Sequence, residues 1–332
     1  MAYSSIIKPS TFMNTVLYTG NGNANNSITG VGFSPSWVWI KKRSGADAHY
    51  IFDVPRGVDK QLQSNSTAAQ YDYSGDSNRT LTAFGSDGFT LQTSEGVNHN
   101  NQTFASWNWK ETATAGFDIV LYTGSGSAKT ISHSLSAVPK MIIVKAISAV
   151  SQWAVQHASL GPTKWTELQS TAAADFSTTI WNDTAPTSSV FTVGTNARTN
   201  ANGTTYVAYV FSEKTGYSKF GSYTGNGNAD GTFVNLGFKP AFLMIKRTDS
   251  ANQWIMLNNK MSLYNNNTGD ELYADSNAAQ NSFTDGGADF LSNGFKLRGT
   301  NASVNVNNGS YIYMAFAKNP FVASNFNAAT AR

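Results

Sequence analysis

The pattern Tyr-Thr-Gly-x-Gly-x occurs three times in this chain, opening at Tyr18, Tyr122 and Tyr223. The intervals are 104 and 101 residues (122 − 18 and 223 − 122), so a unit of about one hundred residues is written three times. Such a long period excludes a solenoid, whose repeats are roughly 20–50 residues long. No one copy of the hexad can therefore be interpreted alone.

Each repeat also contains a proline that stands six positions before a lysine, with mostly large apolar residues between them. These runs are 35–41, 139–145 and 240–246. A short apolar run that begins at proline is typical of a strand buried on both faces, since proline is tolerated at the start of a strand and not in its middle. The second short strand of each unit is predicted close behind, at 48–53, 152–157 and 253–258.

The next landmark is a tight turn in two repeats and not in the third. Asp87-Gly88 and Asn293-Gly294 favour the positive-φ turns of tight hairpins, whereas Ser189-Val190 lacks that chemistry. We therefore expect a looser hairpin in the second repeat.

The closing segment of each repeat is apolar on both alternating sets of residues. In the second repeat Tyr206, Ala208 and Val210 form one set, and Val207 and the residues two and four positions after it form the other. Aromatic and β-branched residues of this kind fit a pleated sheet surface. One face is expected to fill the core of its own unit, and the other needs cover from a neighbouring repeat or another subunit.

Short strands separated by frequent turns predict an all-β chain of three tandem ~100-residue β-sandwich repeats, jelly-roll or concanavalin-like, packed directly on one another. The variable middles, 56–80, 159–186 and 259–286, are expected to be loops, with a turn or two of helix at 61–70 or 163–173 as the only helical candidates. The predicted divisions are a lead-in at 1–14, repeats at 15–112, 113–215 and 216–319, and a tail at 320–332.

Composition excludes several classes of protein. Only 13% of the 332 residues are charged and the formal net charge is +3, which is a poor surface for binding nucleic acid. The chain has no cysteine, so disulfides, thiolate metal sites and cysteine nucleophiles are excluded. The first residues lack the features of a secretory signal peptide, and no apolar run is long enough for a membrane helix. We therefore expect no signal-directed export and no membrane insertion.

Catalytic, cofactor and metal motifs are weak. The hexad at 122–127 precedes Lys129-Thr130 and superficially suggests a phosphate loop, but Ala128 stands where that motif needs glycine, and the other repeats have no Lys-Thr pair. We interpret each hexad as a Gly-rich turn that opens a sandwich. The four histidines have no metal-ligand spacing. The acidic residues of the third repeat lack the spacing of a calcium loop and are expected to form a solvated turn; they are Asp270, Glu271, Asp285 and Asp289. We predict no catalytic, cofactor-binding or metal-binding residue.

Aromatic residues dispersed through the variable middles are the remaining functional signal. They either stack on sugar rings or anchor an interface, or they fold back to cover the edge of the core. The candidate loop contacts are Tyr71, Tyr73, Trp165, Trp181, Tyr264 and Tyr273.

The repeat unit resembles a repeated domain of virion and tail structural proteins of tailed, marine-type bacteriophages. The resemblance is carried by the hexads, by 28–41 with its Ser-Pro-Ser-Trp-Val-Trp-Ile-Lys ending, by 64–67, by 84–91 and by Trp-Asn-Trp-Lys at 107–110. It covers nearly the whole chain, and repeat two diverges most. It implies a particle protein with lectin-like sandwich domains and supplies no catalytic residue.

The sequence hypothesis is therefore a non-enzymatic virion structural protein, made in the host cytoplasm. A tail fibre or tail-associated adhesin that contacts host-surface glycans is the preferred form, and a capsid decoration or head-fibre protein is the alternative. Its expected partners are other virion proteins and further copies of itself, with a homotrimer favoured. The rival from another class is a polysaccharide depolymerase, which needs two opposed carboxylates.

Overall fold

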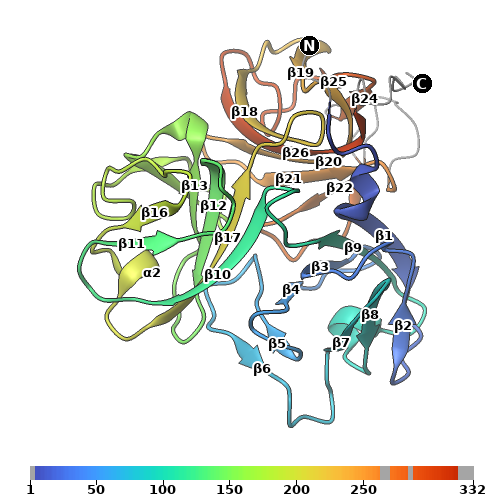
Figure 1. Cartoon of the computed structure of the whole chain (residues 1–332). Coiled ribbons are helices and arrows are strands. Elements are labelled where there is room, and N and C mark those ends of the chain that lie inside the picture. Colours follow the sequence, from blue (N-terminus) through green and yellow to red (C-terminus); the bar gives the residue numbers. More distant parts are fainter. Residues whose placement is uncertain (1–3, 262–269, 283–286, 321–332) are drawn as a thin grey trace.

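The computed structural model describes residues 4–261, 270–282 and 287–320. The described chain is all-β apart from short helical turns, and its antiparallel sheets group into three sandwich units. Figure 1 shows the units around a common centre, with repeat one in blue to cyan, repeat two in green and repeat three in orange to red. The predicted fold class is confirmed.

Each unit has one large sheet with the same strand order. Repeats two and three each have a six-stranded sheet, and in repeat one a bridge between Ile51 and Leu62 joins a four-stranded sheet to a two-stranded one. In repeat one the order is β1 (Met13–Thr19), β9 (Thr103–Trp109), β3 (Trp37–Lys42), β4 (His49–Asp53), β5 (Lys60–Gln61) and β6 (Tyr71–Asp72). In repeat two it is β10 (Phe117–Thr123), β17 (Thr205–Ser212), β12 (Pro139–Ala146), β13 (Ala154–His157), β14 (Lys164–Glu167) and β15 (Asp175–Phe176). In repeat three it is β18 (Ser218–Thr224), β26 (Ser310–Pro320), β20 (Phe238–Arg247), β21 (Trp254–Asn258), β22 (Asp270–Tyr273) and β23 (Asn281–Ser282).

A small sheet covers the outer face of each large one. In repeat one it consists of β2 (Asn26–Ile28), β8 (Gly88–Leu91) and β7 (Leu81–Gly85). In repeat three it consists of β19 (Asp230–Asn235), β25 (Gly294–Arg298) and β24 (Ala288–Leu291). In repeat two only β11 (Lys129–Ser132) and β16 (Val190–Val193) pair. The short helices are η1 (Pro9–Thr11), α1 (Glu95–Asn98), η2 (Ala158–Leu160) and α2 (Ala197–Asn200).

Apolar side chains of the described residues form four buried clusters. Three of them are the private cores of the individual sandwiches. The fourth is a central core to which all three repeats contribute the inward faces of their large sheets. The expectation that one face of each closing strand needs cover from elsewhere is confirmed, and the cover comes from the neighbouring repeats.

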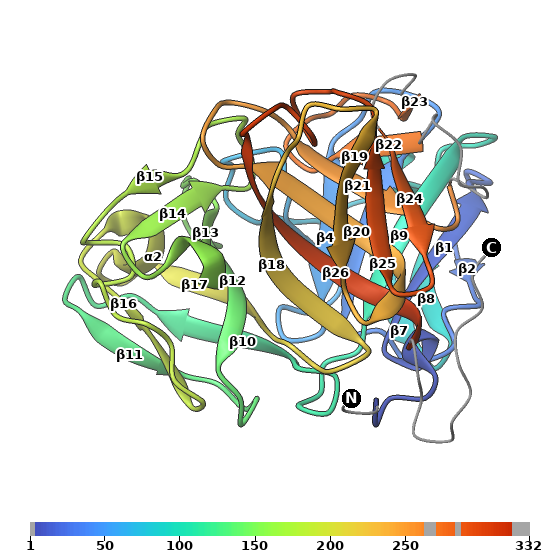
Figure 2. The same ribbon diagram turned by 90° about the horizontal axis from the view of Figure 1, so that it is seen from above.

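Rings from equivalent positions meet in the central core. Trp109, Phe211 and Phe316 each pair with the first residue of the first strand of their repeat. The ring of Phe316 lies 5.8 Å from that of Trp109 and 6.1 Å from that of Phe211, centroid to centroid. The three units are therefore arranged about a pseudo-threefold axis that passes through this core. Figure 2 shows the same units from above, with repeat two on one side and repeats one and three on the other.

The run from proline to lysine forms the buried strand that the sequence predicts. All six residues of β3 are buried, and so are the last six of β12. Proline begins β12, whereas in β20 Pro240 lies at an irregularity in the pairing with β26. In both places the missing backbone N–H of proline falls outside the regular part of the hydrogen-bond ladder.

Three local expectations are refined or corrected. The looser hairpin expected in repeat two is absent: among the described strands β16 pairs only with β11, and no strand precedes it where repeats one and three have β7 and β24. The helical candidates at 61–70 and 163–173 are wrong, because these segments contain β5, β14 and turns. The hexads do not open the sandwiches: each begins with the last two residues of the first strand of a large sheet and leads into the small sheet, as 18–23 does between β1 and β2.

Candidate functional site

Three buried lysines lie at one end of the central core. Lys41, Lys145 and Lys246 occupy the same place in β3, β12 and β20, two residues beyond an inward-facing core residue of each strand. All three are fully buried. From the sequence they are recognisable only as the residues that close a strand.

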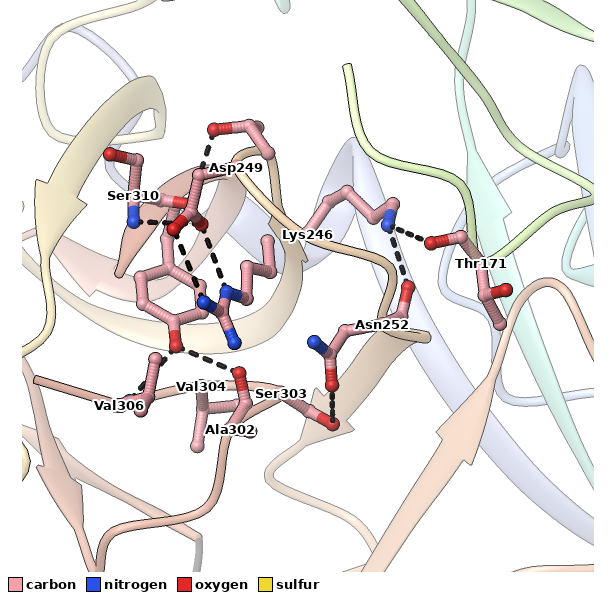
Figure 3. A network of polar contacts seen from close by, with 12 residues as sticks. Thr171, Lys246, Asp249, Asn252, Ala302, Ser303, Val304, Val306 and Ser310 are labelled. Atoms are coloured by element: carbon pink, nitrogen blue, oxygen red, sulfur yellow. Dashed lines mark hydrogen bonds and ion pairs between the residues drawn. The ribbon is translucent and has the colours of Figure 1, made fainter. Parts of the chain in front are cut away.

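Each lysine ammonium donates to a backbone carbonyl of another repeat. Lys145 Nζ lies 3.2 Å from the carbonyl oxygen of Thr67 in repeat one. Lys246 Nζ lies 2.9 Å from that of Thr171 in repeat two, as Figure 3 shows. Lys41 Nζ lies 3.4 Å from the carbonyl oxygen of Asn277 in repeat three. The bonds run from repeat two to one, from three to two and from one to three, so they form a closed cycle.

A second acceptor near each lysine comes from its own repeat. Lys41 donates to Lys42 O at 2.8 Å, Lys145 to Ala146 O at 3.0 Å, and Lys246 to Asn252 O at 2.6 Å. Burial lowers the pKa of each of the three amines to about 8. Asp47 and Asp275 partly oppose this decrease in the pKa of Lys41 and Lys246, respectively.

The same three loops accept backbone bonds from the neighbouring repeat. Thr67 O accepts from Ser151 N at 2.9 Å, and Gln70 N of the same loop donates to Ile147 O at 2.9 Å. Equivalent pairs join repeat three to repeat two and repeat one to repeat three. They are Asn252 N with Thr171 O, Ala174 N with Thr248 O, Asp47 N with Asn277 O, and Gln280 N with Arg43 O.

An aromatic ring N–H completes each interface. Trp153 Nε1 donates to Gln63 O at 3.0 Å, and Trp254 Nε1 donates to Glu167 O at 2.7 Å. In repeat one the ring is an imidazole, and His49 Nε2 lies 2.8 Å from Tyr273 O. Trp39 Nε1 donates to His49 Nδ1 at 2.8 Å, so the neutral ring carries its proton on Nε2. Burial and the nearby Lys41 lower the pKa of His49 to about 3.

These contacts lock the three repeats into one body. The lysines are buried and donate to backbone carbonyls on both sides of an interface. These bonds give hydrogen-bond partners to ammonium and carbonyl groups that would otherwise be buried without any. The loops that accept from the lysines share a sequence pattern: Ser66-Thr-Ala-Ala, Ser170-Thr-Ala-Ala and Ser276-Asn-Ala-Ala. In each loop the serine Oγ accepts from the backbone N–H two residues later, at 3.1 Å.

The hexads are held by a buried asparagine. In repeat two Ser125 N donates to Asn200 Oδ1 at 2.8 Å, Gly126 N donates to Asn200 O at 2.8 Å, and the amide nitrogen of Asn200 donates to Ser127 O. Asn98 and Asn305 make the corresponding bonds in the other repeats. These amide groups bind protein acceptors, which agrees with rejecting a phosphate loop at 122–127.

The structure separates the predicted loop aromatics into two groups. Trp165 and Trp181 are buried, with 5% and 1% of their surface exposed, and lie in the private core of repeat two. Neither is accessible as a contact for an external partner, so for these two the interpretation as core cover holds. Tyr273 is half-buried against the private core of repeat three. Tyr264 lies outside the described residues.

Trp181 is buried because its segment replaces a strand. Gly194 N donates to Ile180 O in repeat two, where Gln92 N donates to Thr80 O in repeat one. Trp181 therefore corresponds to Leu81, the first residue of β7. The tryptophan fills the core space that the third outer strand fills in repeat one.

Tyr71 and Tyr73 remain at the surface. Tyr71 is 40% exposed, Tyr73 is half-buried, and their rings stack with centroids 6.2 Å apart. Phe176 on β15 is 60% exposed and was missed by sequence reasoning. Its signal was a lone aromatic residue within a polar Asp-Phe-Ser-Thr segment.

The acidic residues of repeat three are engaged with neighbours where they are described. Asp289 Oδ2 accepts from Arg298 Nε at 2.6 Å, and Asp270 Oδ1 accepts from Ser282 Oγ at 2.7 Å. Asp285 lies outside the described residues. In the described part of the chain no three His, Cys, Asp or Glu side chains group as a metal site would require.

The chain belongs to a family defined by a domain of unknown function, DUF7483, whose model matches residues 8–320. One family model thus spans all three repeats. No curated protein matches the chain. Among the described helices, none is long and apolar enough to cross a membrane.

Proposed function

We propose that the chain is a non-enzymatic structural protein of a bacteriophage particle, and that it acts as a tail fibre or tail-associated adhesin on host-surface glycans. The observation that carries this proposal is the closed cycle of three like units around one axis. Such a body holds its surface loops on one rigid frame, and in a trimer of the chain each weak contact is repeated and gains strength through effective concentration.

The surface chemistry supports the same function. Few residues are charged, and Asn, Ser, Thr and Gly dominate the loops. Neutral polar side chains suit hydrogen bonding to sugar hydroxyls, and exposed Tyr71 with half-buried Tyr73 supplies aromatic faces. The resemblance to phage virion proteins points to the particle as the location, with other virion proteins and further copies of the chain, as a trimer, for partners.

Adsorption to host cells tests this function. The purified chain, fluorescently labelled, is expected to bind intact cells of the phage host and not cells stripped of surface polysaccharide. If it instead binds capsids that lack it and leaves cells unlabelled, the alternative of a capsid decoration or head-fibre protein is correct.

A depolymerase remains the second candidate, because the pKa of one carboxyl group, that of Glu111, is raised. Burial and the neighbouring Asp118 raise the pKa of Glu111 to about 7, although a bond from Ile119 N to Glu111 Oε1 opposes the shift. An elevated carboxyl pKa is the property of a general acid. Incubation with host polysaccharide decides the matter: sustained release of reducing ends that Glu111→Gln abolishes would establish the enzyme and refute the non-enzymatic proposal.

A further inference from the structure

A group of tyrosines marks one place on repeat one. The ring planes of Tyr71 and Tyr73 make an angle of 28°, and their centroids lie 6.2 Å apart. Tyr50 lies on β4 of the same sheet, and its hydroxyl donates to Asp47 at 3.1 Å. The phenols of Tyr71 and Tyr73 are close enough to Tyr50 to contribute to raising its pKa. Three phenols and one carboxylate therefore gather at this edge of the sheet.

A buried amide without partners belongs to the same place. Gln61 on β5 pairs directly with Tyr71 on β6, so the two side chains point to the same face of the sheet. Gln61 is 0% exposed, and neither its amide oxygen nor its amide nitrogen has a hydrogen-bond partner. Leaving such a group unpaired costs about 1–3 kcal/mol. The fold holds this unpaired amide directly across the strand pair from Tyr71.

The other two repeats provide an internal comparison. Strand pairing places Ala154 and Ile255 where repeat one has Tyr50. It places Asp175 and Asn281 where repeat one has Tyr71. Both repeats form their sandwiches without these tyrosines, so the fold does not require the cluster.

The charges around the cluster disfavour an anionic ligand. Lys42 is paired with Asp47, and Lys60 is paired with Asp72. Asp76 lies near enough to Tyr73 to contribute to raising its pKa. With the nearby cations already neutralised and several carboxylates at hand, hydroxyl groups are better partners than carboxylates or sulfates.

We infer that this tyrosine cluster of repeat one is a carbohydrate subsite that takes one pyranose ring of a neutral glycan. The apolar face of the sugar stacks on Tyr71 and Tyr73, and its hydroxyls bond to the phenol of Tyr50 and the carboxylate of Asp47. This inference rests on the proposed function in that it names the adhesin's ligand class, and it places the contact on one repeat out of three.

Titration calorimetry on the full chain tests the subsite with maltohexaose, cellohexaose and chitohexaose as neutral probes and a hyaluronan hexasaccharide as the charged one. We expect at least one neutral probe to bind. Tyr71→Ala/Tyr73→Ala should weaken its binding at least tenfold, while Tyr71→Phe/Tyr73→Phe should retain most of it because the rings still stack. Phe176→Ala is the matched control, since it removes an exposed aromatic ring from the equivalent strand of repeat two, and it should leave binding unchanged.

The outcomes separate the subsite from the function. The subsite is wrong if no neutral probe binds, if the alanine pair has no effect, or if the charged probe binds tightest; unchanged melting temperatures show that the variants fold. Cell adsorption that survives the alanine pair refutes the subsite and leaves the adhesin in place. Tyrosine-dependent binding of a neutral probe without adsorption to host cells supports the subsite and refutes the adhesin.

Discussion

The contacts between the repeats are more alike than the outer layers of the repeats themselves. Each interface has a lysine ammonium, an aromatic ring N–H and a pair of backbone bonds on the same loop, in all three repeats. The outer layers differ: repeats one and three have three-stranded small sheets, whereas repeat two has only two strands. The cyclic assembly therefore constrains the sequence, while the outer layer leaves each repeat free to differ.

This difference also indicates where function resides. Among equivalent described positions the tyrosine cluster occurs in repeat one alone. A ligand that recognised features shared by all three repeats would meet three similar surfaces. A ligand that recognises one repeat needs features of this unshared kind.

Truncating the central core should have the largest effect. Phe316→Ala removes a ring that contacts Trp109 and Phe211 from the other repeats, and we expect a loss of about 3–5 kcal/mol in the free energy of unfolding. Because the ring is shared, amide hydrogen exchange should accelerate in all three repeats. Phe191→Ala in the private core of repeat two is the comparison, and its faster exchange should be concentrated in that repeat. Equal patterns for the two variants would contradict a shared core.

The interface of repeat one should make the protein sensitive to acid. His49 has a folded-state pKa of about 3, against an unfolded value of about 6.5. The unfolded chain therefore binds the proton first, and stability falls as the pH drops from 6.5 towards 3. At pH 4 this group alone should account for a loss of up to about 3 kcal/mol.

A pair of substitutions isolates that contribution. Trp39→Ile with His49→Trp installs the pair that repeat two carries as Ile143 and Trp153. Urea unfolding at pH 7 and pH 4 should show near-native stability at the higher pH and a smaller loss at the lower one. His49→Trp alone should lower the free energy of unfolding by about 1–3 kcal/mol at pH 7, because it adds volume to a filled core and removes the acceptor of Trp39 Nε1. An unaltered pH dependence in the double variant would rule out His49 as the cause.

The asparagines that hold the hexads should matter about equally in every repeat. Asn200→Ala removes the donor to Ser127 O and the acceptor for Ser125 N, and we expect a loss of about 1–3 kcal/mol. Asn98→Ala and Asn305→Ala should have similar effects, which thermal unfolding can compare. Asn202→Ala is the matched control, because Asn202 is exposed, and it should leave the unfolding temperature nearly unchanged. Costs that differ widely among the three would show that the hexads are not equivalent supports.

Much of the fold follows from the sequence, and the reasons for the exceptions are physical. Alternation in the closing strands shows that both faces are buried, yet it does not show that repeat three returns to repeat one. That closure depends on Lys41, whose partner Asn277 is 236 residues away. Asn98, Asn200 and Asn305 are visible only as an Asn-x-Asn pattern within segments already rich in asparagine. Of the site, Tyr71 and Tyr73 were identified as aromatic residues in the variable middle of repeat one, whereas Gln61 and Tyr50 required the strand pairing to be known.

The lysines should produce the smallest effect, at alkaline pH. Their folded-state pKa of about 8 lies below the unfolded value of about 10.4, so above pH 8 the folded chain loses these protons first. The unfolding free energy should therefore rise between pH 8 and pH 10, on the order of 1 kcal/mol for each lysine. Above pH 10 the buried tyrosines reverse the trend, because burial raises the pKa of residues such as Tyr209 and the unfolded chain ionises first. Lys145→Met should flatten the rise by about one third in urea midpoints measured across this range. If the unfolding free energy of that variant rises as steeply as that of the native chain, groups other than the three buried lysines titrate between pH 8 and pH 10.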